Sequence, residues 1–249
     1  MSNSGWGKAN RIARLRCECG PFLFLALDHG LTSGTVAGLD NVARWAEFAD
    51  QQGFSGVVVN RGRVSGLNPL RRANLILQAV GLPRCTTGHA SRVPVATVAD
   101  ALRYDATALA VQVRFAAEDL SSILSSVANL MGEADGLSIP VLLMVNIEDE
   151  DYGASHLAKY IRMAAELGAD LIKIPLPAGE LGKSELCQIR GVVENSPPVL
   201  LAGGGTDDEF ITRLRVSASL GFSGACVGRN VFQAEDPVAV VDAIREAYT

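Results

Sequence analysis

Lys173 is the side chain with the clearest capacity for chemistry in this sequence. It lies between Ile172 and Ile174 in a short apolar run that ends at Pro175. Side chains alternate along a strand, so isoleucines packed against covering helices would turn Lys173 to the inner face. Burial there lowers the pKa of a lysine, and the neutral amine can attack a ketone or aldehyde to form a Schiff base. The alternative is an ordinary lysine whose ammonium reaches solvent or pairs with a carboxylate.

Asp28 is the candidate partner of that lysine, because it ends another apolar run and is followed by His29 and Gly30. A carboxylate in this place can transfer protons or hold a substrate hydroxyl. It can equally pair with Lys173 or cap the turn that follows. For His29, which stands beside a turn glycine, we expect a structural hydrogen bond.

Two glycine-containing segments predict a phosphate site. One apolar run ends in Gly203 and Gly204, and the next ends in Gly228 and Arg229. Glycines let backbone N–H groups approach an anion closely, and an arginine adds a fork of donors. If the runs are strands seven and eight of a barrel, these loops occupy the usual phosphate-binding position of that fold. A triple glycine on its own is commonly just a turn.

Arg61 and Arg114 follow two further apolar runs and place more cations on the same predicted rim. One interpretation is that they hold a second anionic group of the substrate, such as a carboxylate. The other is that they are ordinary solvated arginines.

Eight short apolar runs recur about every 30 residues and predict strands covered on both faces. They are Phe22–Asp28, Gly56–Asn60, Pro83–Thr87, Ala108–Val113, Val141–Asn146, Leu171–Pro175, Val199–Gly203 and Gly224–Gly228. Helical patterns lie between or after them at Asp40–Gln52, Glu118–Glu133, His156–Leu167, Asp207–Leu220 and Pro237–Tyr248. This alternation predicts a single-domain (β/α)8 TIM barrel over residues 21–249, preceded by an N-terminal extension over residues 1–20. A doubly wound parallel sheet is the alternative.

The composition narrows the class of protein. With 22 basic and 27 acidic residues, the formal net charge of −5 predicts no binding to nucleic acid or anionic membrane. Three histidines and five cysteines, none at metal-ligand spacing, predict no metal site and no cofactor. The unpaired cysteines and the lack of a long apolar run lead us to expect a cytoplasmic protein.

Several segments, in order along nearly the whole chain, resemble those of class I (Schiff-base) aldolases. The family is the archaeal-type fructose-bisphosphate aldolase and DeoC/LacD-like family, which includes 2-amino-3,7-dideoxy-heptulosonate synthases and a thiolase-like branch. The matching segments are Leu27–Gly30, Glu166–Lys173, Ala202–Gly204 and Gly224–Gln233, of which the last is the most specific.

The resemblance implies a Schiff-base lysine at Lys173, an acid–base aspartate at Asp28, and phosphate held by Gly204, Gly228 and Arg229. It also implies a phosphorylated sugar-like substrate and a homo-oligomer, often a decamer.

This chain departs from the family pattern on the proton-transfer side. Relatives carry a tyrosine after the fifth strand where this chain has Asn146, which can form hydrogen bonds but cannot ionise. Tyr152, Glu148 or Asp149 in the same loop is a candidate replacement. Gln112 stands in place of a histidine of the fourth strand, and the polar segment after the lysine is apolar here.

We therefore expect an aldolase or transaldolase-type lyase or synthase that acts on a phosphorylated ketose or aldehyde other than fructose bisphosphate. The alternatives are an isomerase or thiolase-like acyl transferase of the same fold, and a non-catalytic phosphosugar-binding protein. The sequence leaves the donor, the acceptor, the direction of reaction and the oligomer size open.

Overall fold

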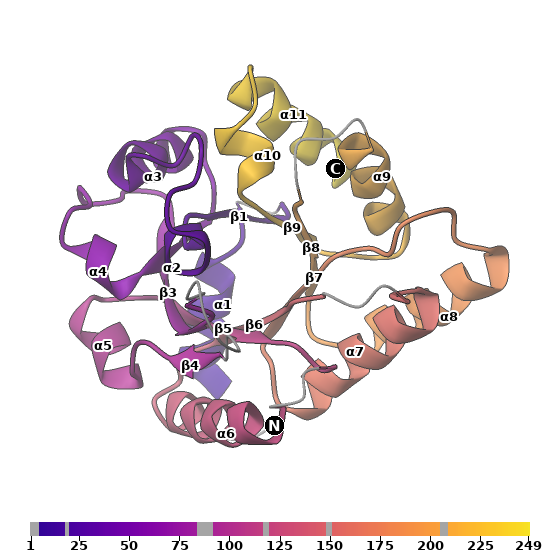
Figure 1. Cartoon of the computed structure of the whole chain (residues 1–249), viewed down its shortest axis with the longest axis horizontal. Helices are drawn as coiled ribbons and strands as arrows, with labels where there is room; N and C mark the ends of the chain where they lie inside the picture. The colour runs from indigo at the N-terminus through magenta and orange to yellow at the C-terminus, as the bar shows by residue number, and fades with distance from the viewer. Residues whose placement is uncertain (1–4, 18–19, 84–91, 117–119, 148–150, 205–208) are drawn as a thin grey trace.

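Within the residues that the structure describes, eight parallel strands close into a barrel (Figure 1). The structure is a computed structural model, and it describes residues 5–17, 20–83, 92–116, 120–147, 151–204 and 209–249. The strands are β1 (Phe22–Ala26), β2 (Gly56–Asn60), β3 (Asn74–Gly81), β5 (Ala108–Val113), β6 (Val141–Val145), β7 (Leu171–Ile174), β8 (Val199–Ala202) and β9 (Gly224–Val227). They pair in chain order, and β9 pairs back with β1, which confirms the predicted (β/α)8 barrel. Because this pairing closes the sheet, the doubly wound alternative is excluded.

Helices surround the barrel and follow most of the strands (Figure 1). The longer ones are α1 (Gly5–Arg14), α3 (Val42–Gln51), α6 (Leu120–Gly136), α7 (Ala154–Glu166), α8 (Lys183–Glu194), α9 (Phe210–Ser219) and α11 (Pro237–Ala247). The shorter ones are α2 (His29–Ser33), α4 (Arg61–Val64), α5 (Val98–Arg103) and α10 (Arg229–Phe232). Several joints from helix to strand turn on a glycine with positive φ, at Gly53, Gly168 and Gly221.

The predicted position of the third strand is wrong. We expected it at Pro83–Thr87, most of which lies outside the described residues, but the third parallel strand is β3, at Asn74–Gly81. Gln78 interrupts its apolar run and is itself buried, and the pairing of β3 with β5 shifts between Gln78 and Val80. A two-residue strand, β4 (Val93–Pro94), then pairs antiparallel with the end of β3.

Two apolar layers hold the barrel, and their separation follows from alternation along each strand. Phe22, Phe24 and Ala26 of β1 belong to the cluster inside the barrel, whereas Leu23 and Leu25 belong to the layer between strands and helices. The inner cluster fills the barrel interior toward the N-terminal ends of the strands. The space left for a ligand therefore lies at the C-terminal ends of the strands.

Helix α1 and the residues after it cover the N-terminal end of the barrel, and α1 lies behind the strands in Figure 1. Leu15 is fully buried in the inner cluster, and Ile12 packs against that cluster. Lys8 binds Asp135 at 2.6 Å and Asp170, just before β7, at 3.2 Å. The predicted N-terminal extension therefore contributes to the core of the barrel.

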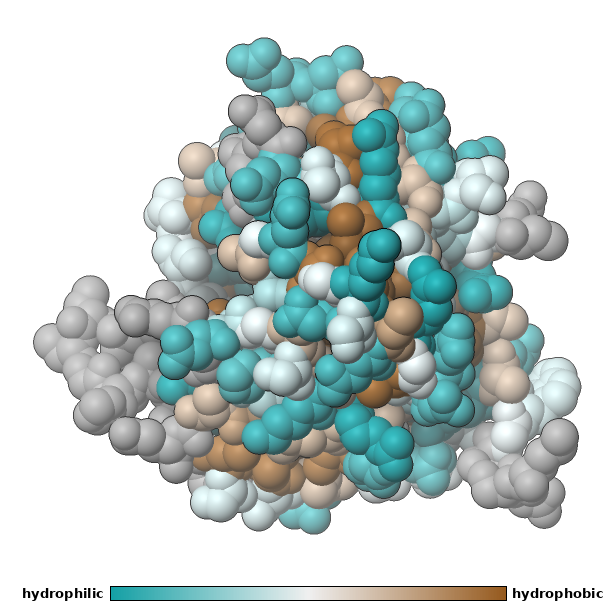
Figure 2. Space-filling model, turned by 90° about the vertical axis from the view of Figure 1, so that its right-hand side faces the viewer, coloured by the Kyte–Doolittle hydropathy of each residue, from teal (hydrophilic) through white to brown (hydrophobic). Residues whose placement is uncertain are grey.

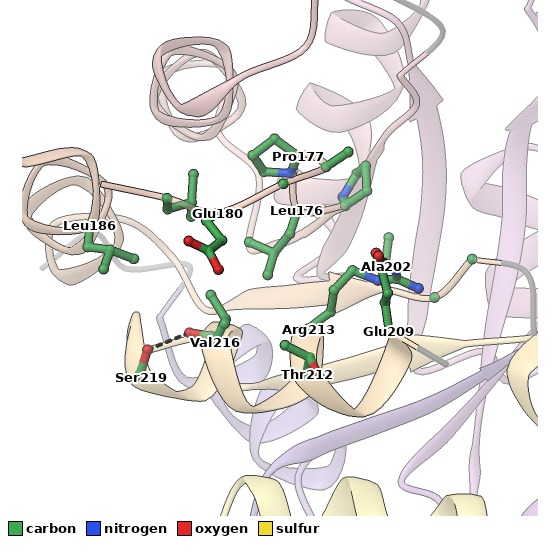
Figure 3. Close-up of a pocket in the computed structure, with 16 residues that line it drawn as sticks. Leu176, Pro177, Glu180, Leu186, Ala202, Glu209, Thr212, Arg213, Val216 and Ser219 are labelled. Atoms are coloured by element: carbon green, nitrogen blue, oxygen red, sulfur yellow. Dashed lines mark hydrogen bonds and ion pairs between the residues drawn. The ribbon is translucent and has the colours of Figure 1, made fainter. Parts of the chain in front are cut away.

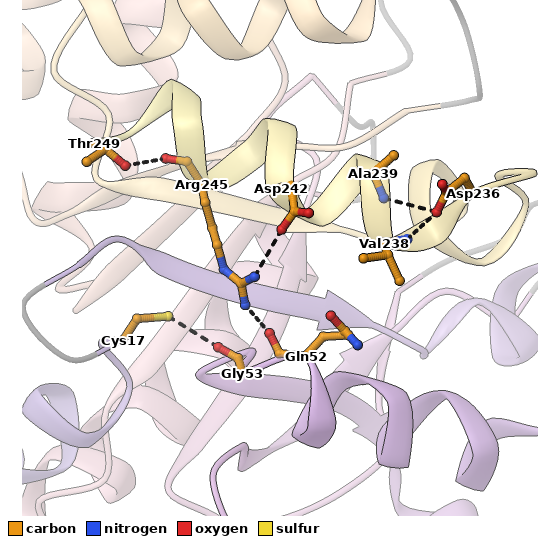
Figure 4. A network of polar contacts seen from close by, with 9 residues as sticks. All are labelled: Cys17, Gln52, Gly53, Asp236, Val238, Ala239, Asp242, Arg245 and Thr249. Atoms are coloured by element: carbon orange, nitrogen blue, oxygen red, sulfur yellow. Dashed lines mark hydrogen bonds and ion pairs between the residues drawn. The ribbon is translucent and has the colours of Figure 1, made fainter.

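Arg245 on α11 ties the last unit of the barrel to the first (Figure 4). Its guanidinium donates to the carbonyl oxygen of Gln52 and binds the carboxylate of Asp242 at 3.3 Å. The first turn of α11 is fixed by the carboxylate of Asp236, which accepts hydrogen bonds from two backbone amides. These contacts reinforce the β1–β9 seam from outside.

On the side of the molecule that carries α8, hydrophilic side chains are spread widely, with smaller hydrophobic areas between them (Figure 2). Among the described helices, none combines the length and the apolar character needed to span a membrane.

Candidate active site

A cavity of about 680 Å³, here called the lysine cavity, opens at the C-terminal ends of the strands. It brings together five of the predicted site residues, which come from different loops and strands. They are Asp28, Asn146, Lys173, Gly203 and Arg229. The remaining polar lining was not singled out from the sequence as binding groups, and it consists of His29, Thr32, Ser33, Thr35, Gln112 and Gln233.

Lys173 faces the interior of the barrel, as alternation along the strand predicts. Ile172 and Ile174 are fully buried in the outer apolar layer, while Lys173 lines the cavity. In the sheet Lys173 pairs with Met144 on one side and Leu200 on the other, and both belong to the inner cluster. The amine therefore stands at the boundary between the apolar filling and the open cavity.

Asp28 is held in place from two directions. Its carboxylate accepts a hydrogen bond of 3.1 Å from Nε2 of Gln112, and its backbone carbonyl accepts one of 2.8 Å from Nδ2 of Asn60. Although Asp28 occupies the cap position of α2, its side chain makes no capping hydrogen bond. The Asp28 residue is 7 % exposed, and it lines the cavity where a ligand would bind.

His29 also faces the lysine cavity, and our expectation of a structural hydrogen bond is wrong for its Nδ1 atom. This atom is buried without a hydrogen bond in the described part of the chain, and lies 3.9 Å from the Asp28 carboxylate. Burial lowers the pKa of His29, the positive charges of Lys173 and Arg229 lower it further, and Asp28 opposes them. The imidazole is therefore neutral at pH 7.

The loop after β6 gives its two candidate residues different environments. Asn146 lines the lysine cavity, and its backbone amide is fixed by the carbonyl of Val113 at 2.9 Å. Tyr152 does not line that cavity, because its hydroxyl donates to the carbonyl oxygen of Pro175 at 2.6 Å. Burial raises the pKa of Tyr152. Glu148 and Asp149 lie outside the described residues.

The glycines after β8 and β9 allow very close packing. The amide of Gly203 donates to the carbonyl of Cys226 at 3.1 Å, and that of Gly204 donates to Oδ1 of Asn230 at 3.0 Å. A side chain on Gly228 would meet the ring of His29 at 2.5 Å. Of these glycines only Gly203 lines the lysine cavity, beside Arg229, so the predicted phosphate contacts of Gly204 and Gly228 stay a prediction.

The structure does not bring Arg61 and Arg114 together with Lys173. Arg61 is exposed on α4, where it binds Asp100 at 3.3 Å. Arg114 is half-buried directly after β5 and is absent from the lining of the lysine cavity.

Comparison with known proteins agrees with this geometry. The model of the DeoC/LacD family aldolases matches residues 22–234, which include every strand of the barrel. The chain belongs to the DeoC/LacD aldolase family. The match supports an aldolase-type lyase over an isomerase or acyl transferase of the same fold.

Two curated relatives of this aldolase-family chain cover most of its length. The 2-amino-3,7-dideoxy-D-threo-hept-6-ulosonate synthase of Halobacterium salinarum is 28 % identical over 244 residues, 96 % of this chain and 90 % of the relative. The 3-hydroxy-5-phosphonooxypentane-2,4-dione thiolase of Salmonella paratyphi A is 26 % identical over 249 residues, 96 % of this chain and 81 % of the relative.

Among solved structures, one of a Schiff-base-forming fructose-1,6-bisphosphate aldolase aligns with a TM-score of 0.84 at 23 % identity. It covers 97 % of this chain and 100 % of the other. This likeness shows that the two proteins share their fold.

Proposed function

We propose that this protein makes or breaks a carbon–carbon bond through a Schiff base on Lys173, with a phosphorylated ketose or aldehyde as substrate. The observation that carries the proposal is the position of Lys173, inside the barrel and at the floor of a polar cavity that also contains Asp28. The family membership and the phosphorylated compound in the name of one relative support it.

In the synthetic direction, the amine of Lys173 gives up a proton and attacks the ketone carbon of the donor, and water leaves as the iminium forms. The iminium withdraws electrons, so the neighbouring carbon loses a proton and becomes an enamine. That carbon bonds to the aldehyde carbon of the acceptor, whose oxygen takes up a proton. Water then releases the product and restores the amine. Cleavage is the same sequence in reverse.

The lining of the lysine cavity suits proton transfer in this sequence. Asp28, oriented by Gln112, is the proposed acid–base group for the hydroxyl and the water. His29 supplies a neutral imidazole beside it. Asn146, which replaces the ionisable tyrosine of the family pattern, supplies an amide. Tyr152 remains a less direct candidate, because its hydroxyl already binds Pro175.

The rim of the lysine cavity suits a sugar phosphate. Thr32, Ser33 and Thr35 present hydroxyl groups to substrate hydroxyls, while Arg229 provides a cation for the phosphate near Gly203. We also propose that Gly204 and Gly228 shape this phosphate site by allowing close packing. Arg61 and Arg114 are proposed only for distal anionic groups of a longer substrate.

Reductive trapping tests the proposal. Borohydride is added to the protein with dihydroxyacetone phosphate, and in parallel with fructose bisphosphate, and the adduct is located by peptide mass mapping. Reduction of an iminium leaves a stable secondary amine, so we expect one adduct, on Lys173, in at least one of the two reactions. Lys173→Ala should abolish it, whereas Lys159→Ala, at an exposed position on α7, should not. No adduct with either compound or with a wider set of phosphorylated carbonyl compounds would refute the Schiff-base mechanism.

We further propose a cytoplasmic location and a homo-oligomeric state, with a decamer as the assembly expected by analogy with the family. Sedimentation of the purified protein measures the second directly.

A further inference from the structure

A second cavity, here called the outer cavity, lies beside the lysine cavity and has a different chemical character. Its volume is about 820 Å³, and it is bordered by the segment after β7, by α8 and by α9 (Figure 3). Its wall is formed largely by apolar side chains, among them Leu176, Pro177, Leu186 and Val216. Cavities of this size with apolar walls are typical of small-molecule sites.

The two cavities share part of their walls. Pro175, Ala202 and Gly203 line both of them. Pro175 follows Lys173 by two residues, so the apolar wall begins next to the proposed Schiff base. Gly203 has no side chain to separate the two spaces, and at this position a Cβ would also collide with Asn230.

The outer cavity is held open by fixed groups. The carbonyl of Pro175 accepts the hydroxyl of Tyr152 at 2.6 Å, and Leu176 and Pro177 are themselves buried. On the other wall, Thr212 and Val216 lie on the same side of α9 (Figure 3). The wall is therefore formed before any ligand arrives, which reduces the ordering cost of binding.

The charged residues that line the outer cavity indicate that it does not bind an anion. Glu180 and Glu209 are exposed carboxylates in its lining, and Arg213, the cation there, binds Glu209 at 3.5 Å. With two carboxylates and one already paired guanidinium, the cavity disfavours a phosphate or carboxylate. Its occupant is accordingly uncharged and apolar.

We propose that the outer cavity binds the apolar chain of the acceptor aldehyde, an alkyl or arylalkyl group, while the aldehyde carbon lies beside the donor enamine on Lys173. This inference rests on the proposed function and adds the substrate class to it. The polar lysine cavity then holds the phosphorylated donor, and the apolar chain extends across Pro175 and Gly203 into the outer cavity. The apolar group of the aldehyde takes no part in the bond changes. Its burial in the outer cavity determines which aldehyde is accepted.

The first test measures binding without chemistry. The probe is 4-phenylbutan-1-ol, an alcohol that cannot form a Schiff base, titrated into the protein by calorimetry. We expect binding to the unmodified protein and to Lys173→Ala, and at least tenfold weaker binding to Val216→Phe, whose larger ring narrows the outer cavity. Ile211→Phe adds similar bulk on α9 at a position outside the lining and should leave the affinity unchanged. Thr212→Trp, at an exposed position of the lining, repeats the test if Val216→Phe folds poorly.

The second test measures selection in the reaction, with dihydroxyacetone phosphate as the donor and propanal, pentanal and heptanal as acceptors. Each methylene that enters the cavity should raise kcat/KM roughly fourfold. Val216→Phe should flatten this dependence, and Ile211→Phe should retain it.

The outcomes separate this proposal from the proposed function. If trapping on Lys173 fails but the alcohol binds and Val216→Phe weakens it, the outer cavity is supported and the Schiff base is not. If trapping succeeds but the alcohol does not bind, or binds equally well to Val216→Phe, the outer-cavity proposal is overturned. If Val216→Phe alters sedimentation while no variant binds the alcohol, the face belongs to a contact between copies, which also overturns it.

Discussion

The two ends of the barrel are built from the same eight strands, but the residues that cover them differ in chemical character. At the N-terminal end, α1 and Leu15 complete the inner cluster, and the charge of Lys8 is matched by Asp135 and Asp170. At the C-terminal end, His29 has a buried nitrogen without a hydrogen bond among the described residues, and Asp28 faces an open cavity. Paired charges and apolar packing at one end, and polar groups that face a cavity at the other, indicate that stability and chemistry depend on different ends of one fold.

The largest effect that tests this division is expected for Asp28→Asn, at the open end. Asparagine keeps an oxygen that can accept the hydrogen bond from Gln112 but loses the ability to transfer a proton. We expect turnover to fall about 100- to 10,000-fold, with little change in the free energy of unfolding. Steady-state kinetics and urea denaturation measure the two quantities.

The matched control is Asp170→Asn at the closed end, which should leave turnover per folded molecule unchanged. A loss of turnover below about tenfold in Asp28→Asn would show that its carboxylate is not the acid–base group.

The next effect is expected for Leu15→Ala at the closed end. Leu15 is fully buried in the inner cluster, so its truncation leaves a cavity. We expect a loss of about 2 to 5 kcal/mol in the free energy of unfolding, with unchanged trapping on Lys173 at low denaturant. Leu102→Ala, at a leucine that is 48 % exposed, is the control and should cost much less. An equal loss in the free energy of unfolding for both variants would mean that Leu15 does not contribute to the core at this end of the barrel.

The smallest effect is expected for Lys8→Met, and it depends on pH. Burial lowers the pKa of Lys8, but its contacts with Asp135 and Asp170 outweigh burial and raise it. Burial raises the pKa of Asp170 despite its hydrogen bond from Val141 and the nearby Lys8. The variant removes the cation of this cluster, and we expect it to lose about 1 kcal/mol of stability at pH 7.

The sign of this pH dependence is fixed by the two pKa shifts. A raised lysine pKa contributes stability that is present below the unfolded value and is lost as the pH rises through the folded value. On the acid side, Asp170 takes up a proton as the pH falls through its raised pKa. The neutral carboxyl group then no longer attracts the charge of Lys8. The stability difference between Lys8→Met and the unmodified protein should therefore shrink in both directions, as thermal unfolding across pH would show. A constant difference would contradict the ion pair.

The orientation of Lys173 was predictable from its two isoleucine neighbours, because alternation on a strand is a local property. The position of β3 was not, since buried Gln78 breaks the apolar pattern and its burial depends on the rest of the barrel. Arg61 likewise stands at the end of a strand, but its pairing with Asp100 on another unit directs it elsewhere. The sequence supplied the residue types of the candidate site, whereas the accessibility of His29 depends on packing against Gly228 and Phe232.

The hydrogen bond from Arg245 to Gln52 joins residues 193 positions apart in the chain. On the ribosome, β1 and α3 emerge long before α11, so this bond and the β1–β9 seam can form only near the end of synthesis. Until then β1 presents one unpaired edge, which is the kind of surface that chaperones bind and that aggregates extend. The interval between the emergence of β1 and that of β9 is thus the most vulnerable period in the life of this chain.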